Sequence, residues 1–182
     1  NARKPAYLPK WHEYLKDGKV TEAHKAFLRE EELCTSLVKI GAYVSGRPLR
    51  MIYGGPQSGI VRAATDGSNI FMPKLHPNKS VVTKHELAHI YFKSNLALRL
   101  AFVRGLIAQF EDENQIKIPP HVRVQLVGDL CFLINILDDL RVNSLWALVY
   151  PGDGEEMEHW YEQIVAPKIK AKAVAAYPDG DV

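Results

Sequence analysis

Two histidines four residues apart, His85 and His89, carry the clearest chemical signal in this chain. They bound the segment His85-Glu86-Leu87-Ala88-His89, which has the pattern H-E-x-x-H. On a helix, residues four apart lie on one face about one turn apart, so both imidazoles can reach the same cation. Glu86 follows the first histidine, where its carboxylate can take a proton from a zinc-bound water. The spacing therefore predicts the chemistry of a zinc-dependent hydrolase.

The residues around this pattern favour the helix that the chemistry requires. No glycine or proline occurs between Ser80 and Leu100, and Ser80 is a residue type suited to an N-cap. Two alternatives remain open: an ordinary helix whose histidines make hydrogen bonds in the core, and a helix of the same kind that binds no metal. A metal site is the favoured interpretation.

A third ligand is expected from a second helix, because catalytic zinc sites normally use three protein ligands and leave one position open. We predict a largely buried helix over residues 122–148 that carries two adjacent acids, Asp138 and Asp139. Burying a carboxylate is costly unless it is paired or bound to a cation. Arg141 can pair with Asp138, whereas Asn143, one turn beyond Asp139, can hydrogen-bond a ligated carboxylate or the far nitrogen of a histidine. We expect Asp139 to be the third ligand, with Asp138 as the alternative.

The remaining pattern predicts an α+β fold that is mainly helical with a small twisted sheet. Asp66-Gly67 separates two extended runs, 60–65 and 68–72, and is a strong signal for a β-hairpin directly before the motif helix. A strand is expected at 49–53. Helices are expected at 9–16, 21–44, 80–92, 96–113 and 155–166 in addition to 122–148, with a turn at 151–154.

Composition and charge limit the classes of function. The chain has 182 residues, 47% of them hydrophobic and 24% charged, with a net charge of +2. This suits one domain, expected at 1–166, followed by a basic tail or linker at 167–182 that leads to a region absent from this chain. The basic residues are dispersed, so neither nucleic acid nor a membrane is expected as a partner.

Cysteine use and the absence of a recognisable leader indicate the compartment. Cys34 and Cys131 lie far apart within apolar, helical surroundings, and they are expected to be buried thiols rather than a disulfide framework. No signal peptide or membrane span is apparent in the sequence. We therefore expect a cytoplasmic protein.

Two further segments carry a resemblance to a known family. The run 135–143, Asn-Ile-Leu-Asp-Asp-Leu-Arg-Val-Asn, and the run 65–73, Thr-Asp-Gly-Ser-Asn-Ile-Phe-Met-Pro, accompany the H-E-x-x-H pattern. Together they resemble gluzincin-type zinc metallopeptidases. More closely, they are similar to the metallopeptidase-like domain that precedes von Willebrand A domains in cobaltochelatase T-subunit-like proteins. The resemblance spans about residues 64–150, and Asp138 stands where that group has glutamate.

The resemblance implies a zincin-like architecture in which the strand 68–72 is the sheet edge that borders the cleft and pairs with an extended peptide. It implies a zinc metallopeptidase in which His85, His89 and Asp139 bind Zn²⁺ and Glu86 is the catalytic base. The partner would be a peptide or protein substrate, together with a von Willebrand A or ATPase component. The alternative is a non-catalytic zincin-fold interaction or scaffold module of a larger von Willebrand/ATPase-type or viral assembly.

A zinc peptidase also needs a hydrogen-bond donor for the developing oxyanion. The sequence offers four candidates without ranking them. They are Tyr91, Tyr150, His76 and Arg141.

Overall fold

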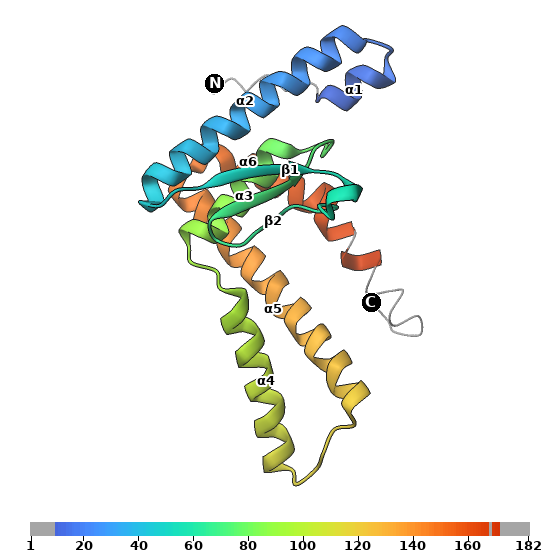
Figure 1. Ribbon diagram of the computed structural model, residues 1–182, viewed down its shortest axis with the longest axis vertical. Helices are drawn as coiled ribbons and strands as arrows, with labels where there is room; N and C mark the ends of the chain where they lie inside the picture. Colours follow the sequence, from blue (N-terminus) through green and yellow to red (C-terminus); the bar gives the residue numbers. More distant parts are fainter. Residues whose placement is uncertain (1–9, 168, 172–182) are drawn as a thin grey trace.

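The computed structural model describes residues 10–167 and 169–171, and it shows a mainly helical chain with one small sheet (Figure 1). This confirms the α+β class. The helices are α1 (Trp11–Lys16), α2 (Val20–Ser45), α3 (Lys79–Tyr91), α4 (Leu96–Glu113), α5 (Pro120–Val149) and α6 (Pro151–Trp160). The strands are β1 (Arg50–Gly54), β2 (Ala64–Thr65) and β3 (Asn69–Pro73), and a short 3₁₀ turn (Pro56–Ser58) and a π-helical turn (Tyr161–Val165) complete the elements.

The predicted hairpin is present and is closed at Asp66-Gly67. β2 pairs antiparallel with β3, and the Asp66 amide donates to the Asn69 carbonyl at 3.2 Å. The Asp66 carboxylate accepts the amides of Ser68 and Asn69 at 2.9 and 2.7 Å. Gly67 has a φ of +91°, a conformation that suits glycine far better than other residues. The turn chemistry read from the sequence therefore explains this part of the sheet.

The prediction that residues 68–72 form an edge strand is wrong. The order in the sheet is β1-β3-β2, with β1 parallel to β3 and β2 antiparallel to it. Both sides of β3 are therefore paired, so its backbone has no free edge for an added peptide strand. The cause is β1, which precedes the hairpin in the chain and joins β3 on the side opposite to β2.

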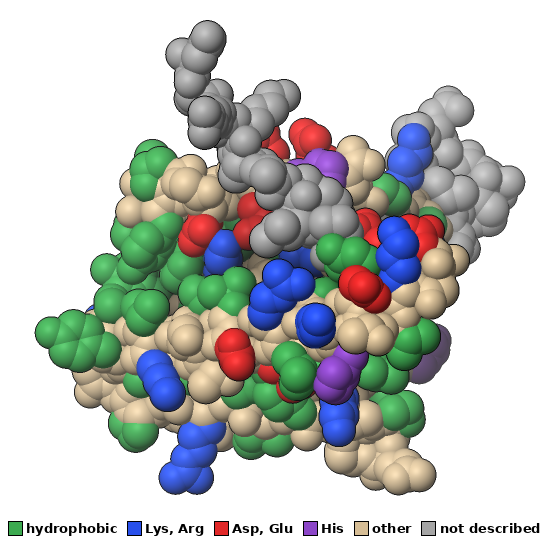
Figure 2. All heavy atoms as spheres, turned by 90° about the horizontal axis from the view of Figure 1, so that it is seen from above, with side chains coloured by type: hydrophobic (Ala, Val, Ile, Leu, Met, Phe, Trp, Pro, Cys, Tyr) green, Lys and Arg blue, Asp and Glu red, His purple; other side chains and the backbone are tan. Residues whose placement is uncertain are grey.

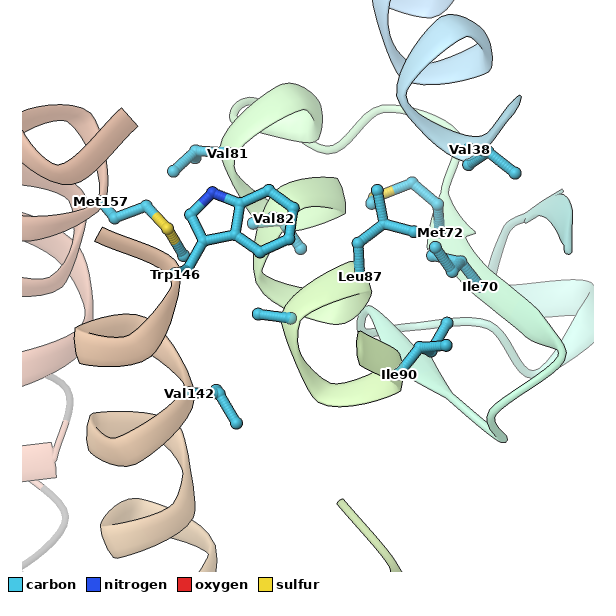
Figure 3. Packing of buried hydrophobic residues seen from close by; sticks show 11 residues of the cluster. Val38, Ile70, Met72, Val81, Val82, Leu87, Ile90, Val142, Trp146 and Met157 are labelled. Atoms are coloured by element: carbon cyan, nitrogen blue, oxygen red, sulfur yellow. The ribbon is translucent and has the colours of Figure 1, made fainter. Parts of the chain in front are cut away.

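The motif helix α3 lies at the centre of the molecule. All of its residues from Lys79 to Ile90 are buried, and it contacts α2, β2, β3, α5 and α6. Figure 3 shows α3 between two groups of apolar side chains. Trp146 packs towards Val81 and Val82 on one side, whereas Leu87 points towards the strand residue Met72 on the other. Burial on both sides holds this helix in one position.

Two buried lysines add polar anchors to α3. Lys79 Nζ donates to Glu31 Oε1 at 3.0 Å, which joins the start of α3 to α2. Lys84 Nζ donates to Asp153 Oδ1 and Glu156 Oε2, each at 2.7 Å, which joins α3 to α6. Charge pairing makes it possible to bury these amines. The helix that carries the histidines is thus fixed along its length.

Helices α4 and α5 form a two-helix arm that projects from the body (Figure 1). The prediction that residues 122–148 are largely buried is wrong, because only Val142 and Trp146 of α5 are buried. The end of α5 with these residues packs in the body, whereas its other end lies along α4 in the projecting arm. For the same reason Cys131 on the arm is half-buried, whereas Cys34 on α2 is fully buried. By length and composition alone, α5 is long and apolar enough to cross a membrane.

Residues 151–154 do not form the predicted turn, because α6 already begins at Pro151. Proline is well suited to the first position of a helix, where its missing N–H is not needed. Gly154 packs closely on Ala147, since an added Cβ would lie 3.2 Å from the alanine Cβ. Gly154 therefore serves close helix packing instead of a turn. Most of the predicted tail, 167–182, lies outside the described residues.

The end of the body that faces away from the arm shows no region of a single charge. In Figure 2, which looks onto this end, lysine and arginine side chains are intermingled with aspartate and glutamate. This distribution accords with the small net charge of the chain.

Candidate metal centre

Helices α3 and α5 bring together three side chains of the types that bind metals. The Nε2 atoms of His85 and His89 lie 3.1 Å apart. Asp139 Oδ1 lies 3.1 Å from His89 Nε2 and 3.7 Å from His85 Nε2. The four-residue spacing on α3 sets the first distance, and the contact between α3 and α5 sets the other two. Within the described residues this is the one group of three or more such side chains close enough to hold an ion.

These distances fit a tetrahedral zinc ion. Ligand atoms about 2.0–2.2 Å from a tetrahedral zinc lie roughly 3.3 Å from one another, close to the three measured separations. Asp139 Oδ1 is also buried with no hydrogen-bond partner among the described residues. A buried carboxylate oxygen without a partner is costly. A cation at the centre of the three atoms would satisfy it, so the donor set fits a metal by both distance and chemistry.

Hydrogen bonds on the far side of each ring orient the histidines. His85 Nδ1 lies 2.8 Å from Asn143 Oδ1, and His89 Nδ1 lies 2.9 Å from Ser94 Oγ and 3.3 Å from Asp138 Oδ2. Amide and carboxylate oxygens only accept, so each Nδ1 carries the proton and each Nε2 keeps its lone pair. Both lone pairs are then available at the cluster, the arrangement that histidine ligands usually adopt. Asn143 makes the contact expected from the sequence.

His85 is held in its neutral form. Burial lowers the pKa of its imidazole, and the nearby His89 lowers it further, against the opposing effect of Asp139. A neutral imidazole is the form that binds a metal. The pKa shift and the hydrogen bond from Nδ1 therefore favour the same protonation state.

The carboxylate of Asp138 forms ion pairs with two arginines. Arg99 Nη2 and Arg141 Nη2 each lie 2.6 Å from its carboxylate. Burial alone would raise the pKa of Asp138, but hydrogen bonds from Ser94 and Arg141 and the charge of Arg99 hold it below its usual range. Arg141 was expected from the sequence, whereas Arg99 was not, because its contact depends on how α4 meets α5. The carboxylate of Asp138 supports His89 and lies outside the group of three.

Glu86 lies on α3 between the two histidines and is 7% exposed. Burial raises the pKa of its carboxyl to about 7, partly opposed by His89 and increased by Asp139. A carboxylate with a pKa near neutrality can both accept and release a proton.

Trp160, at the end of α6, is a site residue that the sequence alone did not reveal. Its ring centroid lies 5.5 Å from that of His85, with the planes inclined by 51°. Its Nε1 is buried and has no hydrogen-bond partner among the described residues. In the sequence Trp160 is only an aromatic residue within the predicted helix 155–166, and such a residue carries no signal for a site.

The four candidate oxyanion donors suggested by the sequence have other surroundings than the three clustered donor atoms. Tyr91 and Tyr150 line an apolar cavity with Leu87, on a different face of α3 from His85 and His89. His76 Nδ1 accepts the backbone amide of Asn78 at 3.1 Å. Arg141, besides Asp138, donates to Ser94 Oγ at 3.2 Å. In the part of the chain that the structure describes, none of the four is bonded to the three clustered donor atoms.

No family model matches the chain, and neither the curated proteins nor the solved structures contain a significant match. The fold and the site together define an α+β chain with a His–His–Asp group, of which the histidines are buried and the aspartate is half-buried, that could hold a metal ion. What the site can do is therefore inferred from its own geometry.

Proposed function

We propose that this chain is a zinc-dependent hydrolase, specifically a metallopeptidase with a zincin-like fold. The observation that carries this is the convergence of His85 Nε2, His89 Nε2 and Asp139 Oδ1, with separations of 3.1 to 3.7 Å. The two histidines come from the buried helix α3 and the aspartate comes from helix α5. Two regular helices therefore hold the three side chains in place. Three protein ligands leave a fourth position open, as catalytic zinc requires.

In this function His85, His89 and Asp139 would hold Zn²⁺, and their far-side partners would keep them in place. When bound, zinc would polarise the scissile carbonyl and lower the pKa of a coordinated water. Glu86 would accept a proton from the attacking water and pass it to the leaving amine. Its pKa of about 7 suits both transfers near neutral pH.

We assign the oxyanion donor to Trp160, because its Nε1 is a buried donor without a partner beside His85. Trp160→Phe keeps an aromatic ring against His85 but removes the N–H. Loss of one oxyanion donor lowers kcat by about 10²–10³-fold, so a reduction of this size is expected with zinc content unchanged. Steady-state kinetics that show wild-type kcat for this variant would exclude the assignment.

An extended substrate would bind at β2, not at β3. The edges of the sheet are β1 and β2, and α3 packs against β2 and β3. The open edge of β2 is therefore the one nearer to the motif helix. Pairing of a peptide with this edge would supply backbone hydrogen bonds to the substrate. Because β2 has only two residues, side-chain pockets must contribute much of the affinity.

Removal and return of zinc test the proposed function directly. The purified protein, incubated with a diverse peptide library, should cleave peptides when loaded with one equivalent of zinc. Cleavage should stop after chelation and return when zinc is restored, as mass spectrometry of the products would show. Cleavage that persists in fully zinc-free protein, or no cleavage of any peptide by the loaded protein, would contradict a zinc peptidase.

A non-catalytic interaction module is the second candidate, and the exposed apolar side chains of the arm favour it. Leu98, Phe102 and Leu137 are 67%, 59% and 56% exposed. In such a module the metal would be structural, and its removal would cost folding free energy. Chelation would then lower the Tm strongly without any hydrolysis to lose. In either case the partners proposed are a von Willebrand A or ATPase component, in the cytoplasm.

A further inference from the structure

We propose that the two-helix arm is a self-association surface, through which two copies of this chain pair arm to arm into a four-helix bundle. This surface lies outside the metal centre and does not depend on hydrolysis. It explains a feature that the proposed function leaves unused: large apolar side chains on a projecting pair of helices.

Leucines on α5 repeat at the spacing of a coiled coil. They occur at positions 126, 130, 133, 137 and 140, with alternating intervals of four and three residues. This 3.5-residue period is the pattern by which helices pack against partner helices. Leu133, Leu137 and Leu140 are 51%, 56% and 42% exposed. In one copy, therefore, much of this leucine stripe has no helix against it within the described part of the chain.

Helix α4 carries a second apolar stripe. Leu98, Phe102, Leu106 and Phe110 recur at every fourth position and are 67%, 59%, 42% and 51% exposed. They are not the residues that bind α4 to the rest of the molecule, because that face contains the buried Val103 and Ile107. The stripe is thus free in a single copy for contact with another apolar surface.

The two stripes lie on the same side of the arm. Leu98 and Phe102 of α4 line a shallow hollow together with Ile134 of α5. On a helix, Leu130 and Leu137 lie four residues before and three residues after Ile134, and so on the same side of α5. The two stripes therefore lie on one side of the arm, and the hollow between them is also lined by the charged side chains of Arg99, Asp138 and Arg141.

The area of this face matches what a stable dimer needs. A side chain of this size that is about half exposed offers on the order of 100 Å² for burial. The seven exposed residues of the two stripes together offer on the order of 700 Å² per copy. A stable interface buries about 800 Å² from each partner. Pairing of two antiparallel helix pairs through such faces gives a four-helix bundle.

The charged side chains of the arm favour a second copy of the chain over a membrane as the partner of its apolar face. The far end of the arm carries an ion pair between Arg123 and Glu111, at 3.1 Å, and the exposed charges of Glu113 and Lys117. Each charge at the centre of a bilayer costs about 2.5–3.5 kcal/mol on insertion scales. Arm-to-arm packing buries the leucine face and leaves these charges in water.

Sedimentation of the full chain, with matched variants, tests this pairing. The wild type should sediment as a dimer of twice 20.5 kDa at micromolar concentration. Leu133→Glu with Leu137→Glu should give a monomer, with the Kd for dimerisation raised by at least about 100-fold. Val124→Glu is the control, because Val124 is 75% exposed and lies nine residues, or about 180°, from Leu133 on α5. This variant should remain a dimer.

Circular dichroism should show that both variants keep wild-type helix content, since the replaced residues are exposed. A wild type that stays monomeric at high micromolar concentration would overturn the inference. So would a double variant that still dimerises, or a Val124→Glu variant that dissociates equally. Binding of the wild type to phosphatidylcholine–phosphatidylserine vesicles, lost in the double variant, would assign the face to a membrane and overturn it as well.

Discussion

Replacing Glu86 with glutamine is expected to lower kcat for peptide hydrolysis by about 10²–10⁴-fold, the usual contribution of a general base, while zinc remains bound. The amide has nearly the shape of the carboxylate, so the packing around α3 is retained, but it cannot accept a proton from water. Burial makes this carboxyl a suitable base, because it raises the pKa to about 7. Steady-state kinetics with zinc-loaded protein would measure the change.

Glu30→Gln is the matched control for this variant. Glu30 is also a buried glutamate, but it lies on α2, where it accepts the Ser80 amide at 3.2 Å, away from the three clustered donors. It should keep wild-type kcat when zinc-loaded. Normal turnover by Glu86→Gln, or an equal loss in both variants, would remove Glu86 from the role of base.

Replacing Asp139 with alanine is expected to weaken zinc binding by more than about 100-fold. Changes to residues that only orient a ligand typically cost about 10–100-fold in metal affinity, and Asp139 would itself be a ligand. Its Oδ1 atom has no hydrogen-bond partner among the described residues, and its Oδ2 atom accepts the exposed Asn135 amide at 3.1 Å. In the metal-free state the stability should stay close to that of the wild type, because the lost Asn135 hydrogen bond is offset by removal of a buried oxygen without a partner.

Two aspartates on the same helix serve as comparisons. Asp138→Ala should weaken zinc binding within the range of about 10–100-fold, because Asp138 supports His89 from outside the cluster. Asp129→Ala should leave affinity unchanged, since Asp129 is exposed and bonds only to Gln125. Competition titrations with a zinc indicator would rank the three. A larger loss for Asp138→Ala than for Asp139→Ala would reverse the assignment of the third ligand.

The sequence was informative where local spacing decides the structure. His85 and His89 lie on one face because α3 is a regular helix, and the hairpin closes at Asp66-Gly67 because of the turn chemistry there. The choice of Asp139 over Asp138 also followed from neighbours within one helix. These features depend on residues a few positions apart, so a single sequence contains them.

Features that depend on contacts between distant segments were not predictable in the same way. β1 joins β3 in parallel, and nothing in the local pattern of residues 68–72 indicates which of its sides will be covered. Arg99 meets Asp138 only because α4 folds back along α5. Trp160 reaches His85 because α6 packs on α3 through Lys84. Each of these contacts joins elements far apart in the chain.

The arm shows why an apolar helix was mistaken for a buried one. The leucines of α5 predict that the helix will pack against something apolar, and that inference does not identify the partner. In one copy of the chain, α4 covers only part of the stripe, and Leu133 and Leu137 stay exposed. Hydrophobic periodicity thus predicted an apolar surface on α5 but did not show whether another part of the chain covers it.

The number of zinc ions bound per chain tests the central claim most directly. Elemental analysis of purified wild-type protein, after dialysis against trace zinc, should give one zinc per chain, and Glu86→Gln should give the same value. His85→Ala, which removes one of the three clustered donors, should give close to none. A wild type that binds no zinc, or a His85→Ala variant that retains the full amount, would contradict a metal centre at His85, His89 and Asp139.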